Sequence, residues 1–308
     1  KYSKIKNLSL NNLITYITLE FLPMKKSKFL FAIFTAVSAF NANAYQTEVG
    51  TMYEFTDMDG GEVNSFGING KYYFNPVETK NYPLAEAAFL NKASNIGAGY
   101  TYSKVEDDQD YAKLEYNSVG IVGEYFVPNT PLYLSGAFNR TKREVTVDDL
   151  GSVNDNGNGY AVEVGFLPTD GLLLAAGVTD LSESFDPVQA SKYGFITSFA
   201  NATTVTGEDD DTAVTLRAKY ITQISGFYTN FEGQTYIGDE TTYRLGADLY
   251  LDPTLSIGAS FADSTAEDSD TIFSLRAQKF FTPQVAVGLT YTTVDDANSF
   301  GINGAFRF

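Results

Sequence analysis

The sequence predicts an all-β fold: a transmembrane, up-and-down antiparallel barrel of about fourteen strands. Two observations carry this prediction. Apolar and polar residues alternate with a period of two, as in Y-R-L-G-A-D-L-Y-L from Tyr243 to Leu251, and this is the period of a strand with unlike faces. Very short turns also alternate with longer acidic segments, a pattern typical of barrels with short periplasmic turns and long outer loops.

The first 44 residues are not expected to belong to the barrel. Met24–Ala44 reads MKKSKFLFAIFTAVSAFNANA, with lysines, a short apolar stretch and a small-x-small end, as in a cleaved secretory signal. The apolar stretch is too short to span a bilayer as a helix. Residues 1–23 have no obvious role, and we interpret them as read-through upstream of a true start at Met24. The predicted domain is one barrel over residues 45–308, exported through the inner membrane.

Composition excludes several function classes. The chain has 38 acidic and 21 basic residues and a net charge of −17, which argues against binding to nucleic acid. It has no cysteine and no histidine, so it lacks a disulfide framework and cannot use a catalytic histidine. No carboxylate pair stands out from the acidic background, and no glycine-rich phosphate loop is present. We therefore expect no enzyme, no cofactor and no metal centre.

The strands are predicted between these turn and loop signals. Short proline turns are expected at 128–131, 168–171, 252–254 and 282–284, and acidic loops at 106–110, 148–159, 263–270 and 294–298. The strands that follow are 45–56, 63–74, 95–105, 111–126, 131–142, 158–167, 171–181, 211–222, 225–234, 241–251, 254–264, 271–282, 285–294 and 299–308. In 111–126 either Val122 or Ile121 with Tyr125 could face outward, so we expect a bulge there.

Two segments interrupt the meander. Residues 75–94 lie on the short-turn side, and Pro83 is placed to start a helix over 84–91. This helix either lies on the surface or covers the periplasmic mouth. Residues 181–210 form the longest loop on the acidic side, and they either fold into the barrel or rise above its rim as a hairpin. The loop contains an aromatic patch: Tyr193, Phe195 and Phe199.

The polar strand faces carry charges of both signs, which indicates a wet lumen with lipid on the apolar side. The residues expected to line the pore are Arg217, Lys219, Arg244, Arg276, Glu48, Glu163 and Asp248, with Glu54 and Arg307 on the same face. A field between opposed basic and acidic groups would orient small polar solutes. The alternative is that these charges only neutralise one another across the wall.

Aromatic residues gather at the strand ends, as two membrane interfaces would require. Those expected toward the short turns are Phe74, Tyr125, Phe126, Tyr250, Phe280, Phe281, Phe306 and Phe308. Those expected toward the long loops are Tyr53, Phe55, Tyr100, Tyr102 and Tyr291. The phrase NSFGING occurs twice, at 64–70 and 298–304. Because a closed barrel has no free edge, the first hairpin must pair with the last strand, and both copies would end at one interface.

The last strand also carries a family resemblance. Phe300, Ile302, Phe306 and Phe308 resemble the terminal signature of Gram-negative outer-membrane proteins, which implies recognition by the outer-membrane assembly machinery. YQTEVG at 45–50, PLAEAAFLNKASN at 83–95 and LRAQKFFTPQVAVG at 275–288 resemble a family of small outer-membrane porins with fourteen-stranded barrels. The resemblance is scattered over most of the chain after the signal. It implies a passive or weakly selective pore.

The function expected is therefore a narrow, water-filled porin for small polar or charged solutes in the bacterial outer membrane. Acidic loops, above all Glu208, Asp209, Asp210 and Asp211, would raise the local cation concentration or bridge lipopolysaccharide through divalent ions, or are merely solvated. The alternative function is a structural or adhesive barrel whose lumen is plugged by residues 181–210 and 83–91. The expected partners are lipid and lipopolysaccharide, the assembly machinery and small solutes.

Overall fold

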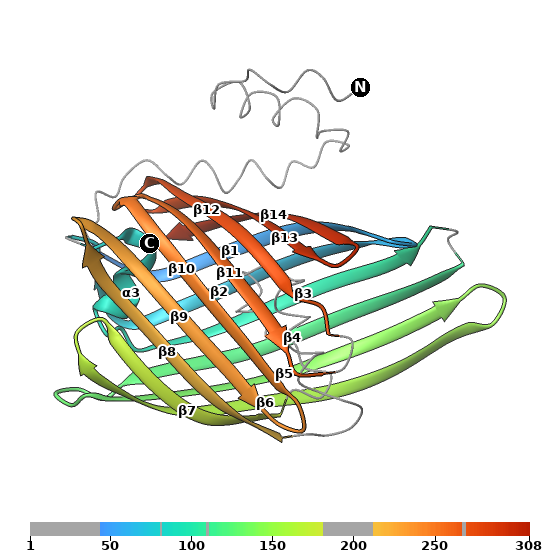
Figure 1. Cartoon of the computed structure of the whole chain (residues 1–308), viewed down its shortest axis with the longest axis horizontal. Helices are drawn as coiled ribbons and strands as arrows, with labels where there is room; N and C mark the ends of the chain where they lie inside the picture. Colours follow the sequence, from blue (N-terminus) through green and yellow to red (C-terminus); the bar gives the residue numbers. More distant parts are fainter. Residues whose placement is uncertain (1–43, 81, 109–110, 181–211, 267–268) are drawn as a thin grey trace, which may run out of the picture. The chain divides into compact units, whose positions relative to one another are not determined.

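The computed structural model describes residues 44–80, 82–108, 111–180, 212–266 and 269–308. In these residues fourteen antiparallel strands form a closed barrel, which confirms the predicted fold class (Figure 1). The strands are β1 (Ala44–Met58), β2 (Gly61–Glu78), β3 (Asn95–Asp107), β4 (Ala112–Phe126), β5 (Leu132–Val147), β6 (Gly151–Thr169), β7 (Leu172–Asp180), β8 (Thr212–Ile224), β9 (Phe227–Ile237), β10 (Thr241–Asp252), β11 (Leu255–Ser264), β12 (Ile272–Thr282), β13 (Val285–Val294) and β14 (Ala297–Arg307).

The barrel closes where β1 pairs with β14, and the two NSFGING copies lie on either side of β1. Tyr53 of β1 stands opposite Phe66 in the first copy and Ile302 in the second. The first residue of each copy accepts a hydrogen bond from a tyrosine hydroxyl on the preceding strand, Tyr53 to Asn64 and Tyr291 to Asn298, both at 2.7 Å. Closure gives each of the fourteen strands a neighbour on both sides, which a bilayer demands because lipid offers no hydrogen bonds.

The wall has an apolar outer face and a polar inner face. Large apolar side chains are exposed along the outside of most strands, among them Val119, Val164, Leu245 and Ile257. Polar side chains such as Thr101, Thr141 and Ser274 are buried inside the barrel. In the described residues no helix has the length and apolarity needed to span a bilayer. An apolar exterior around a polar interior is the arrangement of an outer-membrane barrel.

The bulge expected in β4 is absent, and that expectation was wrong. β4 pairs with β3 and β5 without a register shift. Ile121 and Tyr125 face outward and Val122 lines the lumen. The shifts in the wall lie instead near the short turns, at Tyr45/Thr47, Phe166/Thr169, Tyr250/Asp252 and Phe280/Thr282. Gly120 and Gly123 keep the apolar count of β4 low, which made its phase ambiguous in the sequence.

This assignment predicts opposite effects for two adjacent substitutions. Ile121→Lys places a charge on the lipid face, so we expect the barrel to lose about 2–4 kcal/mol of stability, less toward an interface. Val122→Lys places the same charge in the lumen and is expected to cost much less. The fraction of folded, heat-modifiable protein across a urea titration in lipid vesicles would measure both. Equal losses would contradict the outward phase of Ile121.

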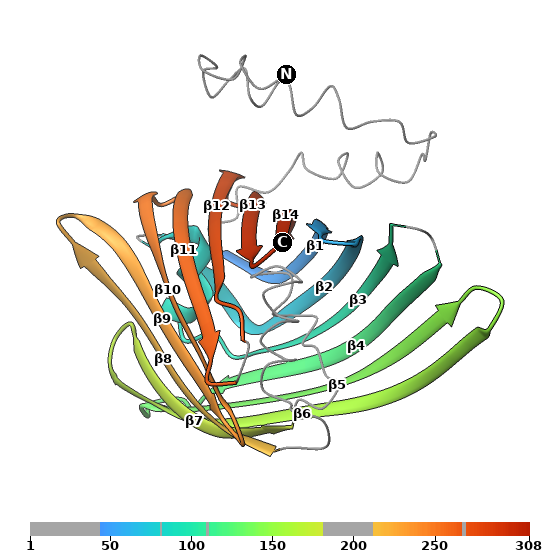
Figure 2. The same ribbon diagram turned by 45° about the vertical axis from the view of Figure 1, so that its right-hand side comes forward.

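Two of the predicted acidic loops are strand and tight turn instead. β5 and β6 leave only three residues, 148–150, between them, and β13 and β14 leave only Asp295 and Asp296. β4 accompanies β5 to its end at Val147, whereas β6 runs on beyond β7, with which it pairs only from Tyr160 onward (Figure 2). The β5–β6 ladder continues because β-branched residues face each other across the strands, as Val145 does Val153. Asp149 and Asp295 hold positive φ angles of 62° and 39°, which aspartate tolerates in tight turns.

A short helical segment lies between β2 and β3. It comprises the 3-10 turn η1 (Leu84–Glu86) and the helix α3 (Ala87–Leu90), and Pro83 precedes it as expected. Its backbone joins the opposite wall, because Leu84 N donates to Pro253 O in the β10–β11 turn at 2.8 Å. Of the two alternatives left open by the sequence, the structure supports the one that covers the short-turn mouth. We call residues 84–90 the plug.

The plug explains why three aromatic residues expected at the membrane interface point inward instead. Phe126, Tyr250 and Phe280 are buried. Phe280 packs with Leu84 and Ala286, and Phe126 meets Phe89 with ring centroids 6.3 Å apart. The remaining short-turn aromatics include Phe74, Phe281 and Phe308, which are exposed on the outer face as expected.

Candidate functional site: the lumen and its plug

The barrel encloses a cavity of about 440 Å³. All seven residues predicted to line a pore lie on its wall, and Ala85, Glu86, Ala88 and Phe89 of the plug line it as well. The seven side chains come from β1, β6, β8, β10 and β12. Because strand residues alternate between faces, placing one charged residue of a strand inward also places inward the residues two positions away. This rule is why residues that face the cavity could be grouped from the sequence alone, and their role in a pore stays a prediction.

The charges on this wall are sorted by sign. Five of the six basic residues that line the cavity come from strands β8 to β14, and these are Arg217, Lys219, Arg244, Arg276 and Arg307. Strands β1 to β7 contribute four acidic residues: Glu48, Glu124, Glu163 and Asp180. Three residues depart from this division: the basic Lys71 on β2, and the acidic Glu232 and Asp248 on β9 and β10. The result is a basic arc and an acidic arc around one lumen.

Where the arcs meet, neighbouring charges form close pairs. Arg217 on β8 binds Glu163 on β6 at 2.7 Å and also donates to the hydroxyl of Tyr133 at 3.0 Å. Tyr133 in turn donates to Glu124 at 2.6 Å. Within the basic arc, Arg276 on β12 binds Asp248 on β10 at 2.6 Å. Such pairs hold their side chains in fixed positions against the wall, because buried charges must be paired and hydrogen-bonded.

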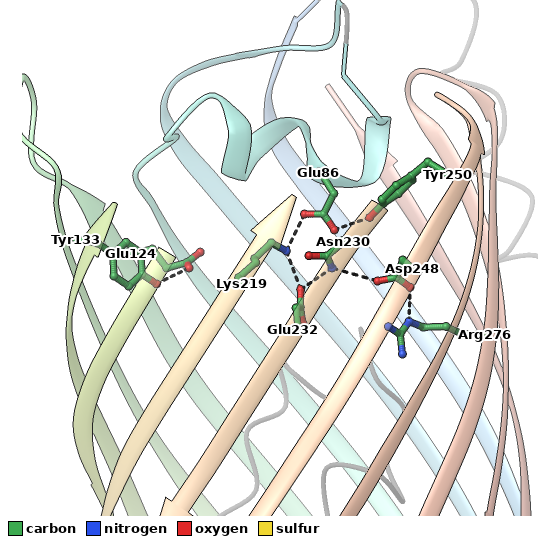
Figure 3. A network of polar contacts seen from close by, with 9 residues as sticks. All are labelled: Glu86, Glu124, Tyr133, Lys219, Asn230, Glu232, Asp248, Tyr250 and Arg276. Carbon is green, nitrogen blue, oxygen red and sulfur yellow. Dashed lines mark hydrogen bonds and ion pairs between the residues drawn. The ribbon is translucent and has the colours of Figure 1, made fainter. Parts of the chain in front are cut away.

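The plug joins this network through a single carboxylate. Glu86 is 4% exposed and extends from the plug toward β8 and β10 (Figure 3). One of its oxygens accepts from the Tyr250 hydroxyl at 2.7 Å, and the other binds Lys219 Nζ at 2.7 Å. Lys219 also binds Glu232 at 2.7 Å. Through Asn230, which donates to Glu232 and Asp248, the network reaches Arg276.

A second anchor holds the plug beside the barrel seam. Arg307 of β14 donates to the carbonyl of Leu84 at 2.8 Å and forms an ion pair with Glu48 of β1. Its guanidinium lies 4.7 Å from the ring centre of Tyr45 and 4.6 Å from that of Phe280. The plug therefore contacts β14, the β10–β11 turn and the β8 wall together. The plug is thus held on several sides of the barrel at once.

Sequence reasoning missed Glu86, Glu124, Asn230 and Glu232. Glu124 and Glu232 carried a usable signal, because the period-two pattern places both on the inner face with Val122 and Asn230. Glu86 carried none, since a helical segment of seven residues does not reveal which wall it will meet. Arg307 was expected inside, but its contacts depend on closure between strands 259 residues apart.

Comparison with known proteins agrees with this geometry. A profile of the family described as "Putative general bacterial porin" matches residues 24–308. The chain belongs to this porin family. The outer membrane protein Omp33 of Acinetobacter baumannii is 30% identical in sequence, with a TM-score of 0.63 over 86% of this chain and 99% of that one. The monoaromatic hydrocarbon channel CymD, 10% identical with a TM-score of 0.51, shares the fold over 86% of this chain and 89% of its own. A comparison with curated proteins found no match.

Family and fold place this porin in the bacterial outer membrane and indicate a channel for small solutes rather than an enzyme. Two further predicted sites are the assembly signal on β14 and the acidic run at 208–211. Phe300, Ile302 and Phe308 of the proposed assembly signal are exposed on the outer face, with Phe306 half-buried. The acidic run from Glu208 to Asp211 and the loop at 181–210 lie outside the described residues.

Proposed function

We propose that this chain forms a narrow, water-filled channel through which small polar and charged solutes diffuse passively across the outer membrane. The observation that carries the proposal is the lumen cavity, lined by a basic arc on β8–β14 and an acidic arc on β1–β7. Opposed charges create a field across the lumen, which orients dipolar solutes and repels uncharged apolar ones. The plug makes the channel narrow at the short-turn end.

Single-channel recording tests this function. Refolded protein comprising residues 45–308 is expected to give discrete current steps in a planar bilayer, and a salt gradient then gives its ion selectivity as a reversal potential. Absence of current from protein that migrates as a folded, heat-modifiable band would contradict the proposal.

The acidic run at 208–211 offers a prediction on selectivity. If these residues concentrate cations at the outer mouth, changing all four to Asn or Gln is expected to shift the reversal potential toward anions at low salt. The shift should fade near 1 M salt, where the screening length is about 3 Å. An unchanged reversal potential at low salt would assign these residues to solvation alone. The same changes at Asp295 and Asp296 are the control, because these two acidic residues lie in the tight turn between β13 and β14.

The second candidate is a structural or adhesive barrel with a closed lumen, and the buried plug favours it. Swelling of proteoliposomes in small sugars or amino acids separates the two candidates, because a closed barrel admits no solute. We also propose that the outward aromatic residues of β14 are recognised by the outer-membrane assembly machinery. Lipopolysaccharide is proposed to bind the acidic outer loops through bridging divalent ions. Phe308→Ala should then slow insertion in cells but leave refolding into pure lipid unchanged.

A further inference from the structure

The plug is apolar except for one residue. Residues 84–90 read L-A-E-A-A-F-L, and Glu86 supplies the sole charge. Its carboxylate is buried between two donors of the barrel wall, Lys219 Nζ and the Tyr250 hydroxyl, each 2.7 Å away. An apolar residue here would have closed the mouth by packing alone, whereas a buried carboxylate is stable only while its donors are present. The contact of the plug with β8 and β10 therefore depends on one small recognition site for a carboxylate, while Arg307 and Pro253 hold its first residue, Leu84.

The charge balance of this site lets Glu86 leave. Lys219 binds two carboxylates, Glu86 from the plug and Glu232 from β9. When Glu86 withdraws, Lys219 and Glu232 still form a neutral pair, and Asn230 still donates to Glu232 at 2.9 Å. The wall is thus not left with an unpaired buried charge, which is the usual penalty for breaking a buried ion pair.

The site also faces the cavity. Lys219, Tyr250, Glu232 and Glu86 all line the lumen space, so a solute that enters the barrel reaches the same two donors that hold the plug. A solute carboxylate offers the geometry and charge of the Glu86 side chain. Each charge-assisted hydrogen bond it forms replaces one that Glu86 gives up.

We propose that Lys219 and Tyr250 form a binding site for small solutes that bear a carboxylate, and that such solutes compete with Glu86 and release the plug. This inference deepens the proposed channel function, since it names a solute class and the contact that admits it. The closed state is then one in which the chain occupies its own solute site. Solutes without a carboxylate do not displace Glu86.

Cysteine labelling tests the site without relying on current. The chain has no cysteine, so Ala87→Cys introduces one thiol at a fully buried position of the plug, where Ala87 packs with Tyr45, Tyr73, Val77 and Ala93. Acetate or succinate is expected to speed its reaction with a maleimide several-fold over chloride at equal ionic strength and pH. Ala93→Cys, which is buried in the same hydrophobic cluster as Ala87, provides the same test if Ala87→Cys folds poorly. Ala262→Cys, buried in β11 away from the plug, should not respond.

Two backgrounds assign the response to the site. With Lys219→Met, labelling is expected to be fast in both salts, because Glu86 and the solute lose the same ammonium partner. With Glu86→Gln, the acetate concentration for half-maximal labelling should fall about tenfold, since a neutral amide competes less well than a carboxylate. Equal labelling in acetate and chloride, an acetate response that survives Lys219→Met, or a response at Ala262→Cys would each overturn the proposal.

Parallel bilayer recordings separate this inference from the channel function. Current steps with labelling that ignores acetate would reject the carboxylate site and leave the channel standing. Acetate-dependent labelling without any current would reject the channel and leave the site standing.

Discussion

Replacing residues 75–93 by an Asn-Gly turn is expected to raise the single-channel conductance several-fold. The substitution removes the whole plug, which contacts the wall at Lys219, Tyr250, Pro253 and Arg307. It also removes the last four residues of β2, where Val77 and Glu78 pair with β1. The barrel should survive, because β2 and β3 pair up to Tyr73 and Asn95, and Phe74 N donates to Ser94 O at 2.9 Å. Two residues of Asn-Gly close such a hairpin favourably. Conductance rises because pore width and wall charge set the flow.

Lys92→Gln is the matched control for this deletion. It breaks an exposed ion pair, 3.0 Å long, between Lys92, which follows the plug, and Asp170 in the β6–β7 turn. Exposed pairs contribute little to stability, so the plug should stay in place and the conductance should not change. Heat-modifiable migration on gels reports folding of both variants. If the deletion variant folds but conducts like the parent chain, the plug does not limit flow.

The sequence predicted the wall better than it predicted what fills it. Strand number, strand order and the inward phase of residues such as Arg217 and Asp248 follow from local alternation, because a strand in a barrel sees lipid on one side and water on the other. The phase of β4 failed as a prediction because two glycines removed the contrast between its faces. The prediction of a loop at 148–159 was wrong because acidic and Asn-rich residues resemble a loop in the sequence even where they remain paired in the β5–β6 hairpin.

The contacts of the plug join residues that are far apart in the sequence. Glu86 meets Tyr250 across 164 residues and Arg307 meets Leu84 across 223 residues. No local pattern encodes which wall a short helical segment will reach. The orientation of Phe126, Tyr250 and Phe280 was predicted wrongly for the same reason. A Phe or Tyr at a strand end suits either a membrane interface or contact with a plug, and the local sequence does not distinguish the two.

Arg307→Met is expected to destabilise the barrel by about 3–5 kcal/mol. Arg307 is buried, and its loss leaves the Glu48 carboxylate without its ion-pair partner and the Leu84 carbonyl without its donor. The cation also lies between the rings of Tyr45 and Phe280, so the substitution removes two cation–π contacts. These contacts join β14 to β1 and to the plug. The seam and the plug should therefore weaken together.

A double-mutant cycle separates the unpaired charge from lost packing. Adding Glu48→Gln to Arg307→Met removes the orphaned carboxylate, so most of the lost stability should return. Lys142→Met is the control, because its pair with Glu144 at 2.7 Å is far more exposed, and we expect a loss of less than about 1 kcal/mol. The chain has no tryptophan, so the folded fraction in urea is measured from heat-modifiable gel bands. No recovery in the double variant would mean that packing against Tyr45 and Phe280, rather than the charge of Glu48, holds the seam closed.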